Sequence, residues 1–173
     1  MVLRSRQSIR PSRSPSFLRH MPNRTPTSDE IDAWHGVVRS YHRVEAALQA
    51  RLADLSLNVT THEVLQHLLR TPGLSQQQLA ARVFTVKSHL SAIVRDLLAR
   101  ELVERHPDPT DARAWQLHLT PAGESLARQA LAEQTALIGA MFSGVAPELT
   151  RHFVSLLATV EGNLIELSRT AAA

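Results

Sequence analysis

Residues 79–123 of the chain, LAARVFTVKSHLSAIVRDLLARELVERHPDPTDARAWQLHLTPAG, contain the pattern that decides the fold. Two apolar helical segments, LAARV and KSHLSAIVRDL, are joined by only three residues, and so short a connection predicts a helix-turn-helix. The segments ELVERH and AWQLHL then alternate apolar and polar residues, which predicts two short strands joined by a turn-rich loop. A helical pair followed by a hairpin is the order of a winged helix-turn-helix.

The composition favours a mainly α protein. Of the 173 residues 43% are hydrophobic but only 4% are aromatic, and Ala and Leu are abundant. No stretch approaches the roughly 18 apolar residues that a membrane-spanning helix needs, so we expect a soluble protein in the cytoplasm. The absence of Cys excludes disulfides and thiolate metal sites.

The first residues differ from the rest in charge. Residues 1–20 contain five Arg and no acidic residue. These five positive charges exceed the net charge of +3 of the whole chain, so the remaining residues carry a slight net negative charge. With Ser and Pro but no apolar period, residues 1–26 predict a disordered extension. Non-specific binding to nucleic acid and a true start at Met21 are the alternatives.

Long helices flank the winged helix-turn-helix. Capping boxes predict helix starts at Thr27–Glu30, Thr60–Glu63 and Ser75–Gln78, and Thr120 with Pro121 predicts another. The break SGVAP precedes a last helix from Pro147. We expect an N-terminal dimerisation helix at 27–58, the winged helix-turn-helix at 59–120 and C-terminal dimerisation helices at 121–173.

Apolar stripes on these flanking helices need a partner. They predict a homodimer with twofold symmetry, while a monomer with one helical core is the alternative. Such a dimer places two recognition helices about one turn of DNA apart, so we expect an inverted-repeat operator with half-sites roughly 10 bp apart.

The second helix of the pair has a polar face suited to double-stranded DNA. Opposite its apolar stripe it presents Lys87, Ser88, His89, Ser91 and Arg95, which can bind phosphates or base edges. In the loop, Asp111 can orient Arg113 toward the minor groove. An ordinary solvated face, and an Asx-turn at Asp111, are the alternatives.

Residues from about 29 to 167 resemble regulators of the MarR type, dimeric winged-helix transcription factors. The resemblance depends on Leu-Ala at 79–80, "LV-x-R" at 102–105, "D-x-R" at 111–113 and "LT-x-x-G" at 119–123, in register without a gap. It implies that Arg113 enters the minor groove, that residues 87–91 face the major groove and that the terminal helices dimerise.

The chain departs from this family pattern at several positions. Phe84 stands where the family usually has Gly, Val86 where it has Ser or Thr, and Glu101 where it has Gly. At positions 95–96 the family usually has an acid followed by Arg, whereas this chain has Arg95 followed by Asp96. We expect Thr85 to cap the recognition helix in place of residue 86. Glu101 in a left-handed turn costs roughly 1–2 kcal/mol.

Spacing argues against a metal site among the nine His, and no cofactor is expected. The resemblance implies an effector cavity between the dimerisation helices and the winged helix, and six residues are candidates for lining it: Trp34, His35, Tyr41, His42, His62 and His67. Each is otherwise a core or surface residue.

The sequence has no cysteine nucleophile, no Gly-rich phosphate loop and no carboxylate cluster, so it gives no indication of an enzyme. We expect a dimeric, ligand-responsive transcriptional regulator, a repressor, with a protein-binding winged helix as the alternative.

Overall fold

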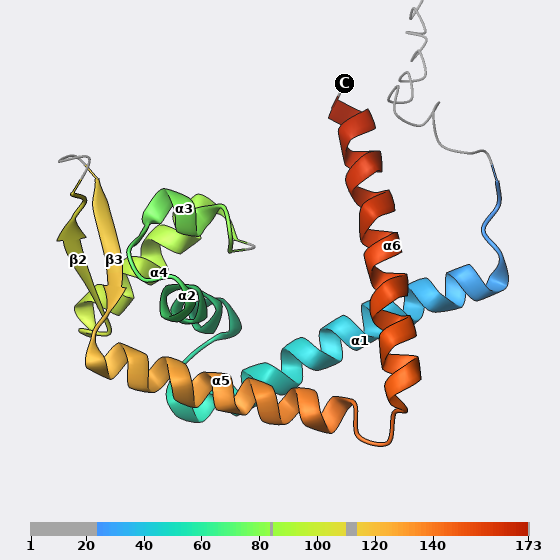
Figure 1. Cartoon of the computed structure of the whole chain (residues 1–173), viewed down its shortest axis with the longest axis horizontal. Coiled ribbons are helices and arrows are strands. Elements are labelled where there is room, and N and C mark those ends of the chain that lie inside the picture. Colours follow the sequence, from blue (N-terminus) through green and yellow to red (C-terminus); the bar gives the residue numbers. More distant parts are fainter. Residues whose placement is uncertain (1–23, 84, 110–113, 173) are drawn as a thin grey trace, which may run out of the picture. The chain divides into compact units, whose positions relative to one another are not determined.

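The computed structural model describes residues 24–83, 85–109 and 114–172. The chain divides into two compact units, residues 31–143 and residues 1–30 with 144–173, and each is described by itself. Among the described residues, no helix combines the length and the apolar character needed to cross a membrane. A mainly α winged helix-turn-helix is confirmed (Figure 1).

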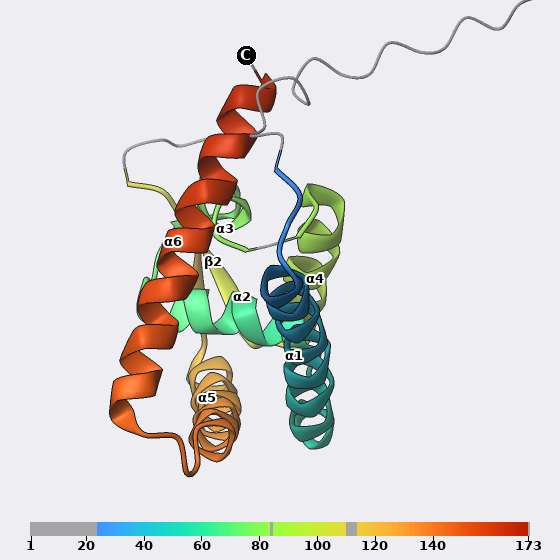
Figure 2. The ribbon, with the colours of Figure 1, turned by 90° about the vertical axis from the view of Figure 1, so that its right-hand side faces the viewer.

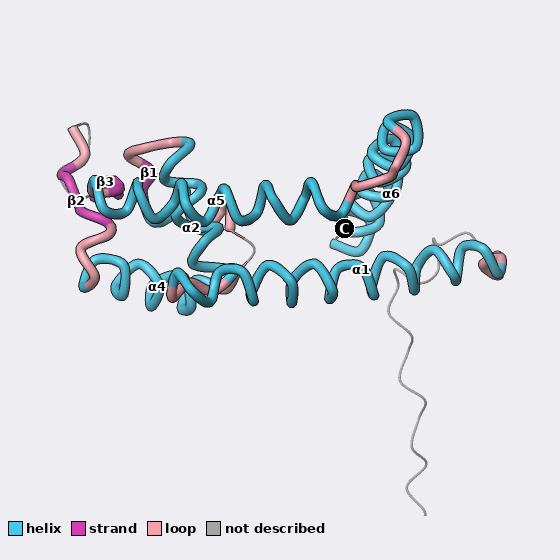
Figure 3. Tube along the Cα trace, turned by 90° about the horizontal axis from the view of Figure 1, so that it is seen from below, coloured by secondary structure: helices cyan, strands magenta, loops and turns pink. Residues whose placement is uncertain are grey.

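The helices of the larger unit follow the predicted order. They are α1 Ser28–Leu52 with the 3-10 turn Ala53–Leu55, α2 Val59–Arg70, α3 Gln76–Ala80, α4 Lys87–Ala99 and α5 Pro121–Met141. α2 lies between α5 and the α3–α4 pair (Figures 1 and 2). α1 and α5 run along each other in Figure 3, and the Arg51 guanidinium of α1 contacts the Glu133 carboxylate of α5 at 3.2 Å.

Three of the predicted helix caps are present and two are wrong. The box at Ser75–Gln78 and the cap at Thr120 form, and Thr27 exchanges hydrogen bonds with Glu30. α2, however, is capped by Asn58, whose Oδ1 accepts from the Thr61 amide at 2.7 Å, because the helix begins one residue before Thr60. α4 begins after Val86 without a side-chain cap, so Thr85 does not cap it.

The sheet is small and antiparallel. β2 (Val103–Pro107) pairs with β3 (Trp115–Leu119), and β3 pairs with β1 (Leu74–Ser75), in the order β1-β3-β2. Leu117 lies opposite both Leu74 and Arg105. The predicted strands are confirmed with shifted ends, whereas β1 was not predicted, since two residues have no readable alternation.

One apolar core holds this unit together. Leucines from four helices and one strand are almost completely buried in it; they are Leu52 of α1, Leu65 and Leu68 of α2, Leu79 of α3, Leu90 and Leu97 of α4, and Leu117 of β3. α5 contributes small residues, Ala127 and Ala130. The helix-turn-helix is therefore fixed against both the sheet and α5.

The connection between the hairpin and α5 is close. A Cβ on Gly123 would lie 1.9 Å from the carbonyl oxygen of Leu102, so only glycine fits there. The Thr120 hydroxyl donates to the carbonyl of Glu101 at 2.7 Å, and the Thr120 amide donates to that of Leu102 at 3.1 Å. The first turn of α5 is thus joined directly to the base of the hairpin.

Glu101 adopts the left-handed conformation expected for it, with φ of 54°. It follows α4, where the Leu102 amide donates to Leu97 and the Glu101 amide donates to Leu98. This pair of bonds is a Schellman motif, which usually has glycine at the left-handed position. The same pattern occurs at Ser56, with φ of 52°.

In the smaller unit, α6 (Pro147–Ala172) is an amphipathic helix of 26 residues. Its large apolar side chains are exposed; they are Leu149, Phe153, Val154, Leu156, Leu157, Val160, Leu164, Ile165 and Leu167. Near the start of α1, Arg24 forms an ion pair with Glu30 and, with the Thr27 amide, lowers the pKa of that carboxyl to about 2.

Candidate nucleic-acid interface

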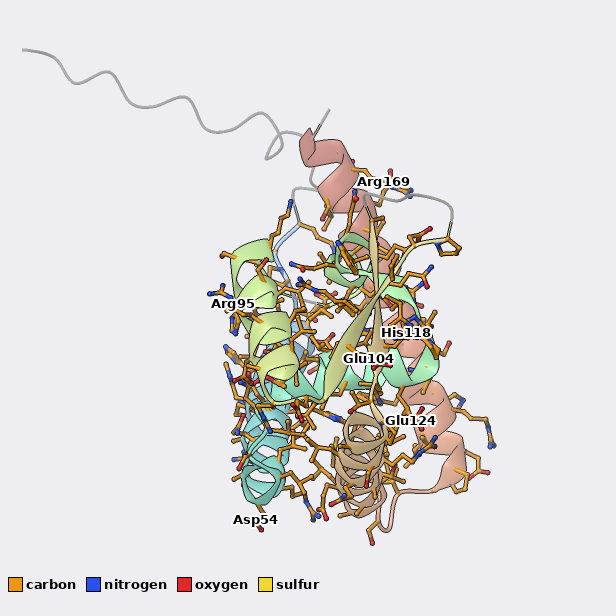
Figure 4. All side chains as sticks on the ribbon, turned by 90° about the vertical axis from the view of Figure 1, so that its left-hand side faces the viewer. Asp54, Arg95, Glu104, His118, Glu124 and Arg169 are labelled. Atoms are coloured by element: carbon orange, nitrogen blue, oxygen red, sulfur yellow. The ribbon has the colours of Figure 1, made fainter. Side chains whose placement is uncertain are left out.

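α4 has one buried face and one exposed face. Leu90, Ile93, Val94 and Leu97 enter the core, as the apolar period of the sequence predicts. The opposite face exposes Lys87, Ser88, His89 and Arg95, and Arg95 projects outward from the helix in Figure 4. Four of the five predicted major-groove residues therefore lie together on one accessible surface.

Ser91 is the exception on this helix. Its side chain is half-buried, its hydroxyl donates to the Lys87 carbonyl at 2.9 Å, and it accepts from Gln76 Nε2 at 2.8 Å. The hydroxyl thus already has both a donor and an acceptor partner within the protein. Gln76, on α3, fixes this part of α4, a role that no motif in the sequence indicates.

The hairpin of β2 and β3 stands beside α4. Its outer face carries Glu104, His106, Gln116 and His118, with the two imidazole rings stacked 4.6 Å apart. The Nε2 atom of His106 lies 3.0 Å from Glu104 Oε1, and Figure 4 shows Glu104 and His118 on the strands. This polar cluster makes the outer face of the hairpin hydrophilic.

Two hydrogen bonds hold the base of the hairpin loop. The Asp108 amide donates to the Ala114 carbonyl at 3.0 Å, and Gln116 Nε2 donates to Asp108 Oδ2 at 3.1 Å. Asp111 and Arg113, the two residues predicted to act at the minor groove, lie outside the described residues. Their interaction stays a prediction.

The six candidate effector residues differ in exposure. Trp34 and Tyr41 on α1 are 64% and 61% exposed, and Tyr41 contacts His42 edge to face. His35 is also exposed, and His67 on α2 is half-buried. A groove of about 660 Å³ between α1 and α5 is lined by other residues, which are Ala47, Ala50, Arg51, Asp54, Leu55, Gln129, Ala132 and Glu133.

His62, the sixth candidate, is buried at the contact between α2 and α5. Its Nε2 atom lies 3.2 Å from Gln134 Oε1, which also accepts from Gln66 Nε2 at 3.0 Å. Burial lowers the pKa of His62, while the contact with Gln134 and the charge of Glu63 act in the opposite direction. Over the described part of the chain, no three His, Asp or Glu side chains are grouped to hold a metal ion.

Comparisons with known proteins agree with this geometry. A MarR family model matches residues 55–114. A putative transcriptional regulatory protein for the hcr operon of Thauera aromatica is 39% identical over 66 residues, which are 38% of this chain and 40% of that protein. The match therefore spans less than half of that relative's length.

Solved structures share the fold over most of the chain. Sco3205 of Streptomyces coelicolor, a MarR family transcriptional regulator solved in complex with DNA, has a TM-score of 0.74 at 23% identity and covers 83% of this chain and 92% of its own. BpsR of Bordetella bronchiseptica, whose DNA binding is regulated by 6-hydroxynicotinic acid, has a TM-score of 0.65 at 24% identity, covering 75% and 98%.

These findings confirm the resemblance noted in the sequence, and the matched proteins carry the descriptions of transcriptional regulators. The match to the family model falls on the same helix-turn-helix and hairpin that the structure describes. Together they show that residues 55–114 match the MarR family model and that the chain is similar in fold to MarR family winged helix-turn-helix regulators.

Proposed function

We propose that the chain is a dimeric repressor in the cytoplasm that binds an inverted-repeat operator in double-stranded DNA and responds to a small-molecule effector. The observation that carries this proposal is the exposed face of α4, whose opposite face is fixed in the core. A recognition helix must be held rigidly from behind while its polar side chains stay free for DNA, and α4 meets both requirements.

On this face, Lys87 and Arg95 supply positive charge and His89 and Ser88 supply hydrogen-bonding groups. Lys87 is the first residue of α4, so residues 87–89 form its N-terminal turn, the part that contacts base edges in a helix-turn-helix. We assign base or phosphate contacts to Lys87, Ser88 and His89, and a phosphate contact to Arg95. Ser91 supports this surface through Gln76.

The hairpin supplies the second contact in this proposal. β2 contacts α4, and the bond between the Asp108 amide and the Ala114 carbonyl closes the base of the loop that joins β2 to β3. Arg113, oriented by Asp111, enters the minor groove, where the negative potential of DNA is concentrated. Side-chain ordering by Asp111 reduces the entropy that Arg113 loses on binding.

Dimerisation is supported by the apolar surface that the single chain leaves exposed. Ile31, Trp34, Val37 and Tyr41 on α1 and nine large apolar residues on α6 have substantial solvent exposure. Two surfaces of this kind on one protein mark an interaction site. A second copy provides matching surfaces with twofold symmetry, which also sets the spacing of the two recognition helices.

The effector is the least specified part of the proposal. The candidates Trp34, His35, Tyr41 and His42 are all exposed on α1, so they contribute to a site only where a second chain covers them. BpsR, which has the same fold, is regulated by 6-hydroxynicotinic acid, so we expect a small aromatic acid as the effector class here.

Titration of the full chain against the DNA upstream of its own gene tests this function. Operator binding predicts an affinity that falls steeply with salt, and the Arg113→Ala variant should lose several-fold or more in affinity. Arg151→Ala is the matched control, because Arg151 is an exposed arginine on α6 that pairs with Glu148. A flat salt response, with equal behaviour of both variants, would favour a protein-binding winged helix.

A further inference from the structure

His62 is one of two buried polar residues in the described part of the chain, with 2% of its surface exposed. It lies in the first turn of α2 and reaches Gln134, which lies between Ala130 and Leu137 on the buried face of α5. The contact therefore joins α2, the helix that precedes the helix-turn-helix, to the long helix that follows the hairpin.

The hydrogen bonds at this contact define which ring nitrogen carries the proton. Gln134 Oε1 accepts from the Gln66 amide at 3.0 Å, so it is an acceptor toward His62 as well. The imidazole must then donate from Nε2, which leaves Nδ1 without a hydrogen in the neutral ring. Nδ1 is buried and has no hydrogen-bond partner.

We infer that the buried seat of His62 between α2 and α5 is a proton-sensitive latch, which holds the two helices together while the imidazole is neutral and opens when the imidazole is protonated, because the charged ring is then unfavourable in this buried position. A second proton must go to Nδ1, where it adds a charge and an N–H group that no acceptor meets. Burying an unpaired charge is far more costly than burying a neutral ring. A fall in pH therefore acts on this contact through protonation of one atom, His62 Nδ1.

The charged groups of the neighbouring elements do not offset that cost. α2 itself contributes Glu63 and His67, and α5 contributes Glu133, which is paired with Arg51 of α1. β3, which also packs on α2, contributes His118, whose ring is stacked on His106. Glu63 favours the protonated form of His62, yet burial outweighs it and the pKa of His62 is lowered.

The direction of the effect follows from linkage. The unfolded chain takes up the proton near the ordinary His pKa of about 6.5, while the folded chain resists it, so folding loses stability as the pH falls below that value. If His62 stays neutral in the folded chain at pH 5.5, the folding equilibrium constant falls about tenfold relative to that at pH 7.5. The loss stops at the lower pKa of the folded state.

Two measurements on the full chain test the latch without DNA. Urea unfolding at pH 7.5 and 5.5 should show the wild type losing about tenfold more in its folding constant than His62→Phe, which cannot be protonated. His67→Phe, on the same helix, is the matched control and should keep the wild-type pH response. Equal pH responses of the wild type and His62→Phe would overturn the inference.

Nitrogen NMR of the wild type gives an answer that does not depend on a variant folding. The His62 ring should remain neutral with its proton on Nε2 at pH 5.5, below the ordinary His pKa of about 6.5. A His62 ring that is protonated at pH 5.5 would overturn the latch.

The effect on DNA rests on the proposed function. The wild type should lose more operator affinity at pH 5.5 than His62→Phe. If neither protein binds DNA at pH 7.5, the proposed function fails, while unfolding and NMR still decide the latch.

Discussion

Replacement of Glu101 by glycine should stabilise the protein. The residue has φ of 54° at the end of α4, where a side chain with Cβ is strained by roughly 1–2 kcal/mol. Glycine removes that strain but loses more backbone entropy on folding, by about 0.5–1 kcal/mol relative to alanine. The expected net gain is therefore about 1 kcal/mol in the free energy of unfolding.

The structure gives this prediction two matched controls. Glu101→Ala removes the exposed carboxylate but keeps Cβ, so it should stay within about 0.5 kcal/mol of the wild type. Ser56→Gly changes the other Schellman motif, at φ of 52°, and should gain a similar amount to Glu101→Gly. The Arg100 guanidinium lies 3.5 Å from the Ser56 carbonyl oxygen, so the double variant measures whether the two motifs are coupled.

Thermal unfolding at one fixed protein concentration measures the effect, because the midpoint of the proposed dimer would depend on concentration. For a chain of this length, 1 kcal/mol corresponds to roughly 2–4 °C. The reasoning fails if Glu101→Gly is no more stable than Glu101→Ala. A gain in Glu101→Ala equal to that in Glu101→Gly would attribute the effect to the carboxylate instead of the backbone.

Two further predictions concern single residues and are read by urea unfolding. Gly123→Ala should destabilise the protein severely, since the new Cβ meets the Leu102 carbonyl at 1.9 Å, whereas Gly139→Ala, with open space in the same helix, should be neutral or stabilising by up to about 1 kcal/mol. Asn58→Ala should cost about 1 kcal/mol through loss of the α2 cap, and Thr60→Ala less; the reverse order would contradict the observed start of α2.

Much of the fold could be predicted because its signals are local. The apolar period of α4 and the alternation of the two hairpin strands each depend on neighbours in sequence, as does the capping box at Ser75. The caps of α2 and α4 were harder to predict. Asn58 and Thr60 are both good capping residues, and only the packing of the preceding turn selects Asn58.

The site was predicted less completely because burial depends on distant parts of the chain. The polar face of α4 follows from its period, but the sequence gives no sign that Gln76, 15 residues away, occupies the Ser91 hydroxyl. Likewise, His35 and His62 look equivalent in sequence, yet α5 covers only His62. The stripe of α1 is continuous, although its own chain buries only Leu48 and Leu52.

The tight approach of Gly123 to Leu102 has a mechanical consequence. With no flexible joint between the hairpin and the first turn of α5, the two must rotate as one rigid piece. The 21 residues of α5 make a lever arm of about 30 Å. Any tilt imposed at its far end is thus transmitted to the hairpin, and the angle of strands β2 and β3 is set from a distance.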